Sequence, residues 1–152
     1  YGVTADRETA LYWLKKSVKG ENPMACLQLG LYYYYTIKTE EAYKKAFGLF
    51  NDAFNLGEKE AIVNIGLCHL QGNGTKENKK EAVKCFKIAA NKYKSSLGYY
   101  NLGICYENGF GIRQDYKKAI EMYGKSVELG EKTGLEAIKR VYSKMNISAY
   151  RV

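Results

Sequence analysis

Three stretches of this sequence share one pattern: Ala25-Cys-Leu-Gln-Leu-Gly30, Ala61-Ile-Val-Asn-Ile-Gly66 and Gly98-Tyr-Tyr-Asn-Leu-Gly103. Each begins with a small residue and ends in an aliphatic residue followed by a glycine. A ring-bearing side chain stands three residues after each glycine, at Tyr33, His69 and Tyr106. The glycines lie 36 and then 37 residues apart. Recurrence at this period is the signature of stacked helix-pair repeats.

A second set of residues keeps the same period: Ala10, Ala46, Ala82 and Ala119, spaced 36, 36 and 37 residues apart. A fourth, weaker copy of the first pattern consists of Gly134, Ile138 and Tyr142, with Lys139 at the glycine position. Two landmarks that keep one spacing indicate that each repeat holds two helices, one carrying the glycine and the other the alanine.

Amphipathic spacing and cap residues place the helices. The loops Gly72-Asn-Gly74 and Gly109-Phe-Gly111 separate the two helices of a repeat, and Thr39 serves as a helix cap where the second copy lacks such a loop. The predicted helices are near 6–19, 23–35, 40–56, 58–70, 79–92, 96–107, 116–129 and 134–145. We therefore expect an all-α fold.

The quoted motifs resemble the Sel-one-like repeat, a relative of the tetratricopeptide repeat. The best matches are Ala25 to Tyr33, Gly109 to Ala119 (with Ile112 for valine) and Asn22-Pro23. The resemblance implies a right-handed α-solenoid of stacked antiparallel helix pairs. It predicts a single repeat domain over 1–152, with repeats at 21–56, 57–93 and 94–130 and partial ones near 1–20 and 131–152. The opening Tyr1-Gly2-Val3 lacks a start methionine, so we expect a fragment of a longer protein.

The resemblance also implies a function and a binding surface. Such repeats serve as non-catalytic adaptors, and the first helix of each pair lines a concave groove in the related tetratricopeptide arrangement. Positions two before, one after and five after each landmark glycine would then face a protein or peptide partner. The predicted groove residues are Gln28, Leu31, Tyr35, Asn64, Leu67, Gln71, Asn101, Ile104 and Asn108. Amides can donate to and accept from a peptide backbone, and the aliphatic and tyrosine side chains add apolar contact.

Composition limits the other functions. Hydrophobic residues make up 46% of the chain, as in ordinary globular proteins, and no stretch is long and apolar enough for a membrane span. The four cysteines form no C-x-x-C pair, so we expect buried free thiols. The lone histidine, His69, replaces a tyrosine of the repeat and is interpreted as a packing residue. We expect no catalytic residues, no metal and no cofactor.

Alternative interpretations remain open. The net charge of +8 and the recurring Lys44, Lys80 and Lys117 would suit nucleic acid or another anionic surface, although a solvated face is favoured. The chain could also be the repeat segment of a larger enzyme. Tyr12 and Trp13 fall where Sel-one-like repeats place a pair of aromatic residues, so the resemblance predicts that they pack in the core. We expect a cytoplasmic location, with the sequons Asn73-Gly-Thr75 and Asn146-Ile-Ser148 leaving the endoplasmic reticulum lumen or secretion open.

Overall fold

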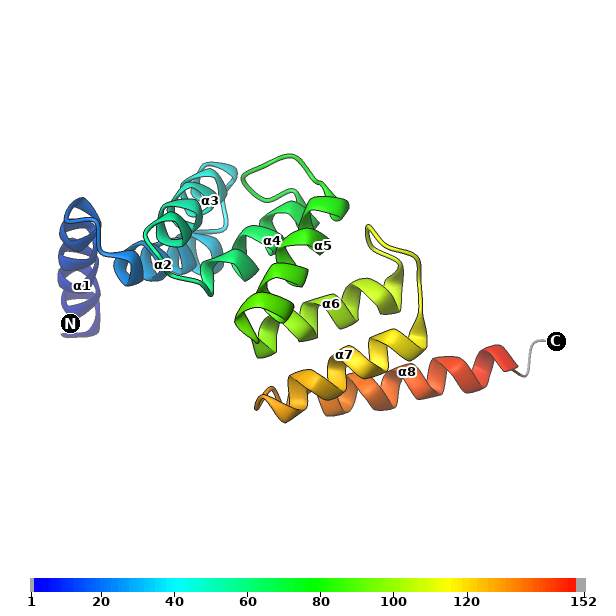
Figure 1. The fold of residues 1–152 in the computed structure, drawn as a ribbon. Coiled ribbons are helices and arrows are strands. Elements are labelled where there is room, and N and C mark those ends of the chain that lie inside the picture. Colours follow the sequence, from blue (N-terminus) through cyan, green and yellow to red (C-terminus); the bar gives the residue numbers. More distant parts are fainter. Residues whose placement is uncertain (1, 150–152) are drawn as a thin grey trace. The chain divides into compact units, whose positions relative to one another are not determined.

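A computed structural model describes the backbone of residues 2–149 and the side chains of residues 6–146. This part of the chain is helical and contains no β-strand. The elements are α1 (Gly2–Lys19), α2 (Pro23–Tyr32) with the π-helical turn Tyr33–Ile37, α3 (Glu40–Asn55), α4 (Ala61–Gln71), α5 (Lys79–Lys87) with the π-helical turn Ile88–Lys92, α6 (Ser96–Asn108), α7 (Tyr116–Glu128) and α8 (Thr133–Ala149). Figure 1 shows them in chain order. The expected all-α fold is confirmed.

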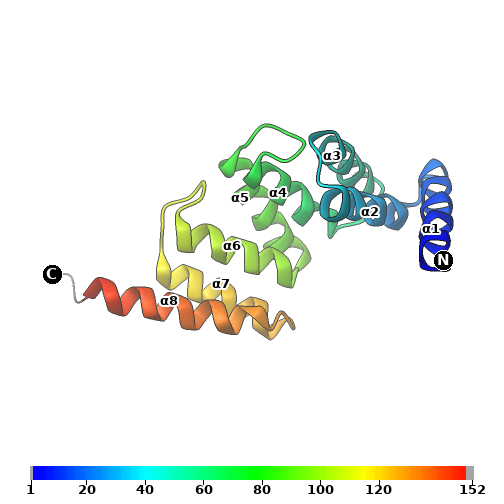
Figure 2. The same ribbon diagram turned by 180° about the vertical axis from the view of Figure 1, so that it is seen from behind.

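The helices form two compact units, Tyr1–Glu77 with α1 to α4 and Asn78–Val152 with α5 to α8. In the first unit α2 packs against α1 and α3, and α3 packs against α4. In the second unit α6 packs against α5 and α7, and α7 packs against α8. Figure 2 shows the antiparallel pairing of α7 and α8 from behind. Each unit is therefore a run of helices that contact mainly their neighbours in the chain.

The landmark glycines are explained by ring packing within each pair. A Cβ atom at Gly30 would lie 2.6 Å from Cε1 of Phe50, and one at Gly103 would lie 2.7 Å from Cδ1 of Tyr123. Both rings are fully buried. The glycine on the first helix thus makes room for an aromatic ring four residues beyond the landmark alanine of the second helix.

The Gly-x-Gly loops need their second glycine for two reasons. Gly74 and Gly111 have φ angles of 74° and 65°, which side-chain-bearing residues rarely adopt. A Cβ atom at Gly74 would also overlap the backbone carbonyl of Tyr43, and one at Gly111 that of Lys79. Each loop therefore lies directly on the start of the preceding second helix.

Local capping sets most helix starts. The side chains of Asn22, Thr39, Asn78, Ser95 and Asp115 each accept a hydrogen bond from a backbone N–H three residues later. The predicted spans agree with the structure within a few residues except at the two ends. Helix α1 begins at Gly2 rather than at residue 6, because a glycine in the first turn does not by itself break a helix, and α8 continues to Ala149 rather than ending at 145.

The four cysteines are buried and unpaired, as expected. His69 is half-buried and packs edge-on against Phe47, in line with a packing role.

The prediction that Tyr12 and Trp13 pack in the core is wrong. Tyr12 and Trp13 are 62% and 57% exposed. Within the described residues α1 packs chiefly against α2, so the face that carries Trp13 has no helix to cover it.

Candidate functional site

The predicted groove residues of the first unit lie on α2, its π-helical turn and α4. Gln28 and Tyr35 are exposed and Leu31 is half-buried, while on α4 Asn64 and Leu67 are half-buried and Gln71 is exposed. Gln28 also borders a cavity of about 380 Å³ between α1 and α2, which Leu14 and Tyr32 help to line. These side chains offer a mixed polar and apolar surface.

A neutral hydrogen-bond cluster links the ends of the two first helices in this unit. The Tyr34 hydroxyl donates to Oε1 of Gln71 at 2.8 Å. The Asn73 amide donates to the Tyr34 hydroxyl at 3.1 Å and to Oε1 of Gln71 at 2.9 Å. Burial raises the pKa of Tyr34 to about 12, so the hydroxyl stays protonated at neutral pH. We call these three residues the neutral link.

The predicted residues of the second unit are less available. Asn101 is 8% exposed and donates its amide to the backbone oxygen of Leu97 at 2.8 Å. Asn108 is exposed but donates to the backbone oxygen of Ile104 at 2.9 Å, and Ile104 itself packs against the core of the unit. Of the three, Asn108 presents the most surface to a partner.

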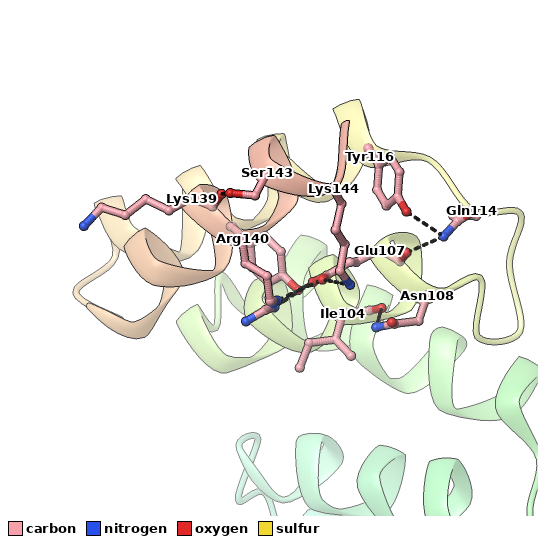
Figure 3. A network of polar contacts seen from close by, with 10 residues as sticks. Ile104, Glu107, Asn108, Gln114, Tyr116, Lys139, Arg140, Ser143 and Lys144 are labelled. Carbon is pink, nitrogen blue, oxygen red and sulfur yellow. Dashed lines mark hydrogen bonds and ion pairs between the residues drawn. The ribbon is translucent and has the colours of Figure 1, made fainter. Parts of the chain in front are cut away.

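A charged cluster in the second unit joins α6 and α7 to α8 (Figure 3). Both carboxylate oxygens of Glu107, whose side chain is 1% exposed, are engaged. Oε1 accepts from Nε of Arg140 at 2.9 Å and from Nζ of Lys144 at 2.7 Å. Oε2 accepts from Nη2 of Arg140 at 2.7 Å and from the Tyr123 hydroxyl at 2.6 Å. We call these four residues the charged link.

The charged link keeps Glu107 ionised. Burial alone would raise the pKa of this carboxyl, but hydrogen bonds from Arg140, Lys144 and Tyr123 outweigh it and hold the pKa at about 2. Burial and the bond to Glu107 raise the pKa of Tyr123, so its hydroxyl remains a donor. A buried carboxylate is stable only with such partners, so the cluster adds polar contacts to the apolar packing of Ala137 and Val141 of α8 against α7.

The charged link was not among the residues predicted from the sequence, although a signal was present. Arg140 and Lys144 follow Lys139, the residue at the fourth glycine position, by one and five residues. These are the same register positions as Leu31 and Tyr35, which were assigned to the groove. The same register, applied to the fourth copy, predicts that Arg140 and Lys144 face the groove.

The outer faces of the second helices carry paired charges. Lys44 and Lys45 lie 3.7 and 3.0 Å from Glu40 and Glu41, and Lys125 lies 2.7 Å from Glu121. Pairs one helical turn apart on an exposed face are typical of a solvated surface, and among the recurring lysines Lys44 belongs to such a pair. Among the side chains that the structure describes, no cluster of three potential ligands could hold a metal ion. None of the described helices combines the length and apolarity needed to cross a membrane.

Comparison with known proteins identifies the family. The Sel1 repeat model matches residues 1–22, 23–58, 59–93 and 96–131, which is most of the chain. The chain therefore belongs to the Sel1 repeat family. Proteins of this family are generally scaffolds for protein–protein interaction.

Solved structures support the same assignment. A Sel1 repeat protein from Oxalobacter formigenes is 28% identical, with a TM-score of 0.78 over 88% of this chain and 53% of its own. A protective antigen of uropathogenic Escherichia coli with an SLR fold is 31% identical, with a TM-score of 0.81 over 91% of this chain and 29% of its own. Helicobacter pylori cysteine-rich protein B, at 19% identity and a TM-score of 0.62, shares the fold. The chain thus spans about half or less of the first two proteins.

Proposed function

We propose that this chain is a non-catalytic scaffold that binds a peptide or protein segment along the first helices of its repeats. The supporting observation is the repeated placement of accessible amides beside apolar side chains. Gln28 and Asn64 stand at the same register position on α2 and α4, and each is followed by a half-buried leucine three residues later. Such a surface can bind a peptide backbone and its side chains together.

The neutral link supports this arrangement within the first unit. Tyr34 stands four residues after one landmark glycine and Gln71 five residues after the next, and their side chains are in contact. The carboxyl ends of α2 and α4 are therefore neighbours. A segment that lies across one of these helix ends could reach the other.

The structure sharpens the choice of residues for a test. Asn101 offers little surface and Gln71 belongs to the neutral link, so the test variant combines Gln28→Ala, Asn64→Ala and Asn108→Ala. A matched control changes three exposed polar residues of the second helices: Asn55→Ala, Asn91→Ala and Lys117→Ala. Peptides selected on the unaltered chain from a random displayed library serve as probes.

We expect the test variant to bind the selected peptides at least about tenfold more weakly, since it removes several hydrogen-bonding groups at once. The control should bind within about twofold of the unaltered chain. Circular dichroism melting establishes that both variants fold. Equal binding by the test variant and the unaltered chain would refute the first-helix surface as the binding site.

A further inference from the structure

The charged link carries more positive than negative charge. Two cations, Arg140 and Lys144, converge on the single carboxylate of Glu107, which leaves a net charge of +1. The carboxylate is buried, whereas the side chains of Arg140 and Lys144 are 47% and 41% exposed. The surplus charge therefore faces solvent rather than the core.

Glu107 uses only one edge of the Arg140 guanidinium. Nε and Nη2 hold the carboxylate, and Nη2 also lies 3.4 Å from the Tyr123 hydroxyl. Nη1 has no hydrogen-bond partner among the residues that the structure describes, so its two N–H groups are left over. Lys144 likewise uses one of its three N–H groups on Glu107.

These remaining donors are already held in place. A free arginine or lysine loses rotamer freedom when it binds an anion, which weakens binding. Here the fork between Arg140 and Glu107 fixes the guanidinium before any partner arrives. Glu107 thus acts as a positioning residue for the two cations, whose side-chain entropy is already lost when the chain folds.

The pair lies beside residues of the proposed binding surface. Ile104 and Asn108 belong to α6, three residues before and one residue after Glu107, so they lie within about one helical turn of it (Figure 3). We propose that Arg140 and Lys144 bind the carboxylate of an aspartate or glutamate side chain in a partner peptide. This inference rests on the proposed function and gives that partner its chemistry: an acidic segment with apolar residues.

The chemistry favours a carboxylate over a neutral group. A planar guanidinium and a neighbouring ammonium match the two oxygens of a carboxylate. The net charge of +8 over the whole chain adds an attractive field for a segment with several acidic residues. Ile104 can contact an apolar side chain next to the acid.

The test uses a fluorescein-labelled peptide in which glutamate alternates with leucine, blocked at both ends, and its counterpart with glutamine for glutamate. We expect the glutamine peptide to bind about tenfold more weakly by fluorescence anisotropy, as for the loss of a charge-assisted hydrogen bond. Because only the peptide changes, this comparison does not depend on the folding of a variant. Equal affinities would overturn the proposal while leaving general peptide binding intact.

Two protein variants test whether the glutamate peptide binds at Lys144. Lys144→Gln and Lys139→Gln each remove one positive charge from α8, but Lys139 is 73% exposed and pairs with Glu136 instead of Glu107. We expect Lys144→Gln to weaken binding of the glutamate peptide about fivefold or more, and Lys139→Gln by less than about twofold. Equal losses would mean that only the overall field attracts the peptide, which would overturn the assigned site.

Two further experiments test whether the site instead binds a different kind of anionic group. A glutamine peptide with a free terminal carboxylate that bound as tightly as the glutamate peptide would replace the proposal with recognition of a chain end. If single-stranded DNA of equal charge displaced the glutamate peptide, phosphate binding would replace the proposal of carboxylate binding. Absence of binding by either peptide would overturn the acidic-segment proposal, whereas the library-selected peptides test the proposed function separately.

Discussion

The neutral link of the first unit and the charged link of the second unit occupy the same place in the repeat. Tyr34 and Gln71 are 37 residues apart, and so are Glu107 and Lys144. In both cases a residue four after one landmark position contacts a residue five after the next. The fold thus sets which positions meet, and the side chains decide whether the contact is a hydrogen bond between neutral groups or an ion pair.

The difference has consequences for stability. Breaking a neutral hydrogen bond that is partly exposed costs about 1 kcal/mol, because water replaces much of the lost interaction. Removing a buried carboxylate leaves two cations without their partner and costs about 3 kcal/mol. The two links should therefore respond differently to mutation and to pH.

The largest effect is expected for Glu107→Gln. The amide cannot neutralise Arg140 and Lys144, so the free energy of unfolding should fall by about 3 kcal/mol in urea denaturation at neutral pH. Glu121→Gln is the matched control, since Glu121 pairs with Lys125 at 2.7 Å but is exposed. It should change the free energy by about 0.5 kcal/mol or less. Similar losses in both variants would show that burial of the Glu107 ion pair has no special role.

A pH titration of the same variant tests the charge of Glu107. The native pKa of about 2 lies below the ordinary 4.5, so the ionised carboxylate contributes stability that is present above pH 4.5 and is lost as the pH falls towards 2. We expect the difference in unfolding free energy between the unaltered chain and Glu107→Gln to shrink by about 3 kcal/mol over this range. A difference that stays constant from pH 4.5 to 2 would contradict an ionised, paired Glu107.

The smallest effect is expected for Tyr34→Phe, which removes one neutral hydroxyl and should cost about 1 kcal/mol. Because the pKa of Tyr34 is raised from 10.0 to about 12, its contribution is present below pH 10 and is lost as the pH rises towards 12. The difference between the unaltered chain and Tyr34→Phe should therefore not change in acid, unlike that for Glu107→Gln. Tyr35→Phe, at an exposed ring beside it, should be neutral within about 0.5 kcal/mol.

The repeat register accounts for the exposure of part of the predicted groove, whose binding role stays a prediction. Gln28, Tyr35 and Gln71 are exposed on first helices, where the register placed them. The register could not show that Asn101 is nearly buried and bonded to its own helix, because the depth of a helix face depends on the side chains packed beside it. It also could not show that Gln71 is engaged by Tyr34 from the preceding copy.

The sequence by itself determined the helical repeat, because helix caps act within a few residues of backbone and the repeat period can be read directly along the chain. Asn22, Thr39 and Asp115 begin their helices through bonds to residues three positions away, and such signals can be read in one dimension. Only the tertiary structure decided which side chains meet. Glu107 finds Arg140 and Lys144 at distances of 33 and 37 residues along the chain, through the packing of α6, α7 and α8. Trp13 remains exposed for a similar reason, since burial depends on a neighbouring helix rather than on the residue's own hydrophobicity.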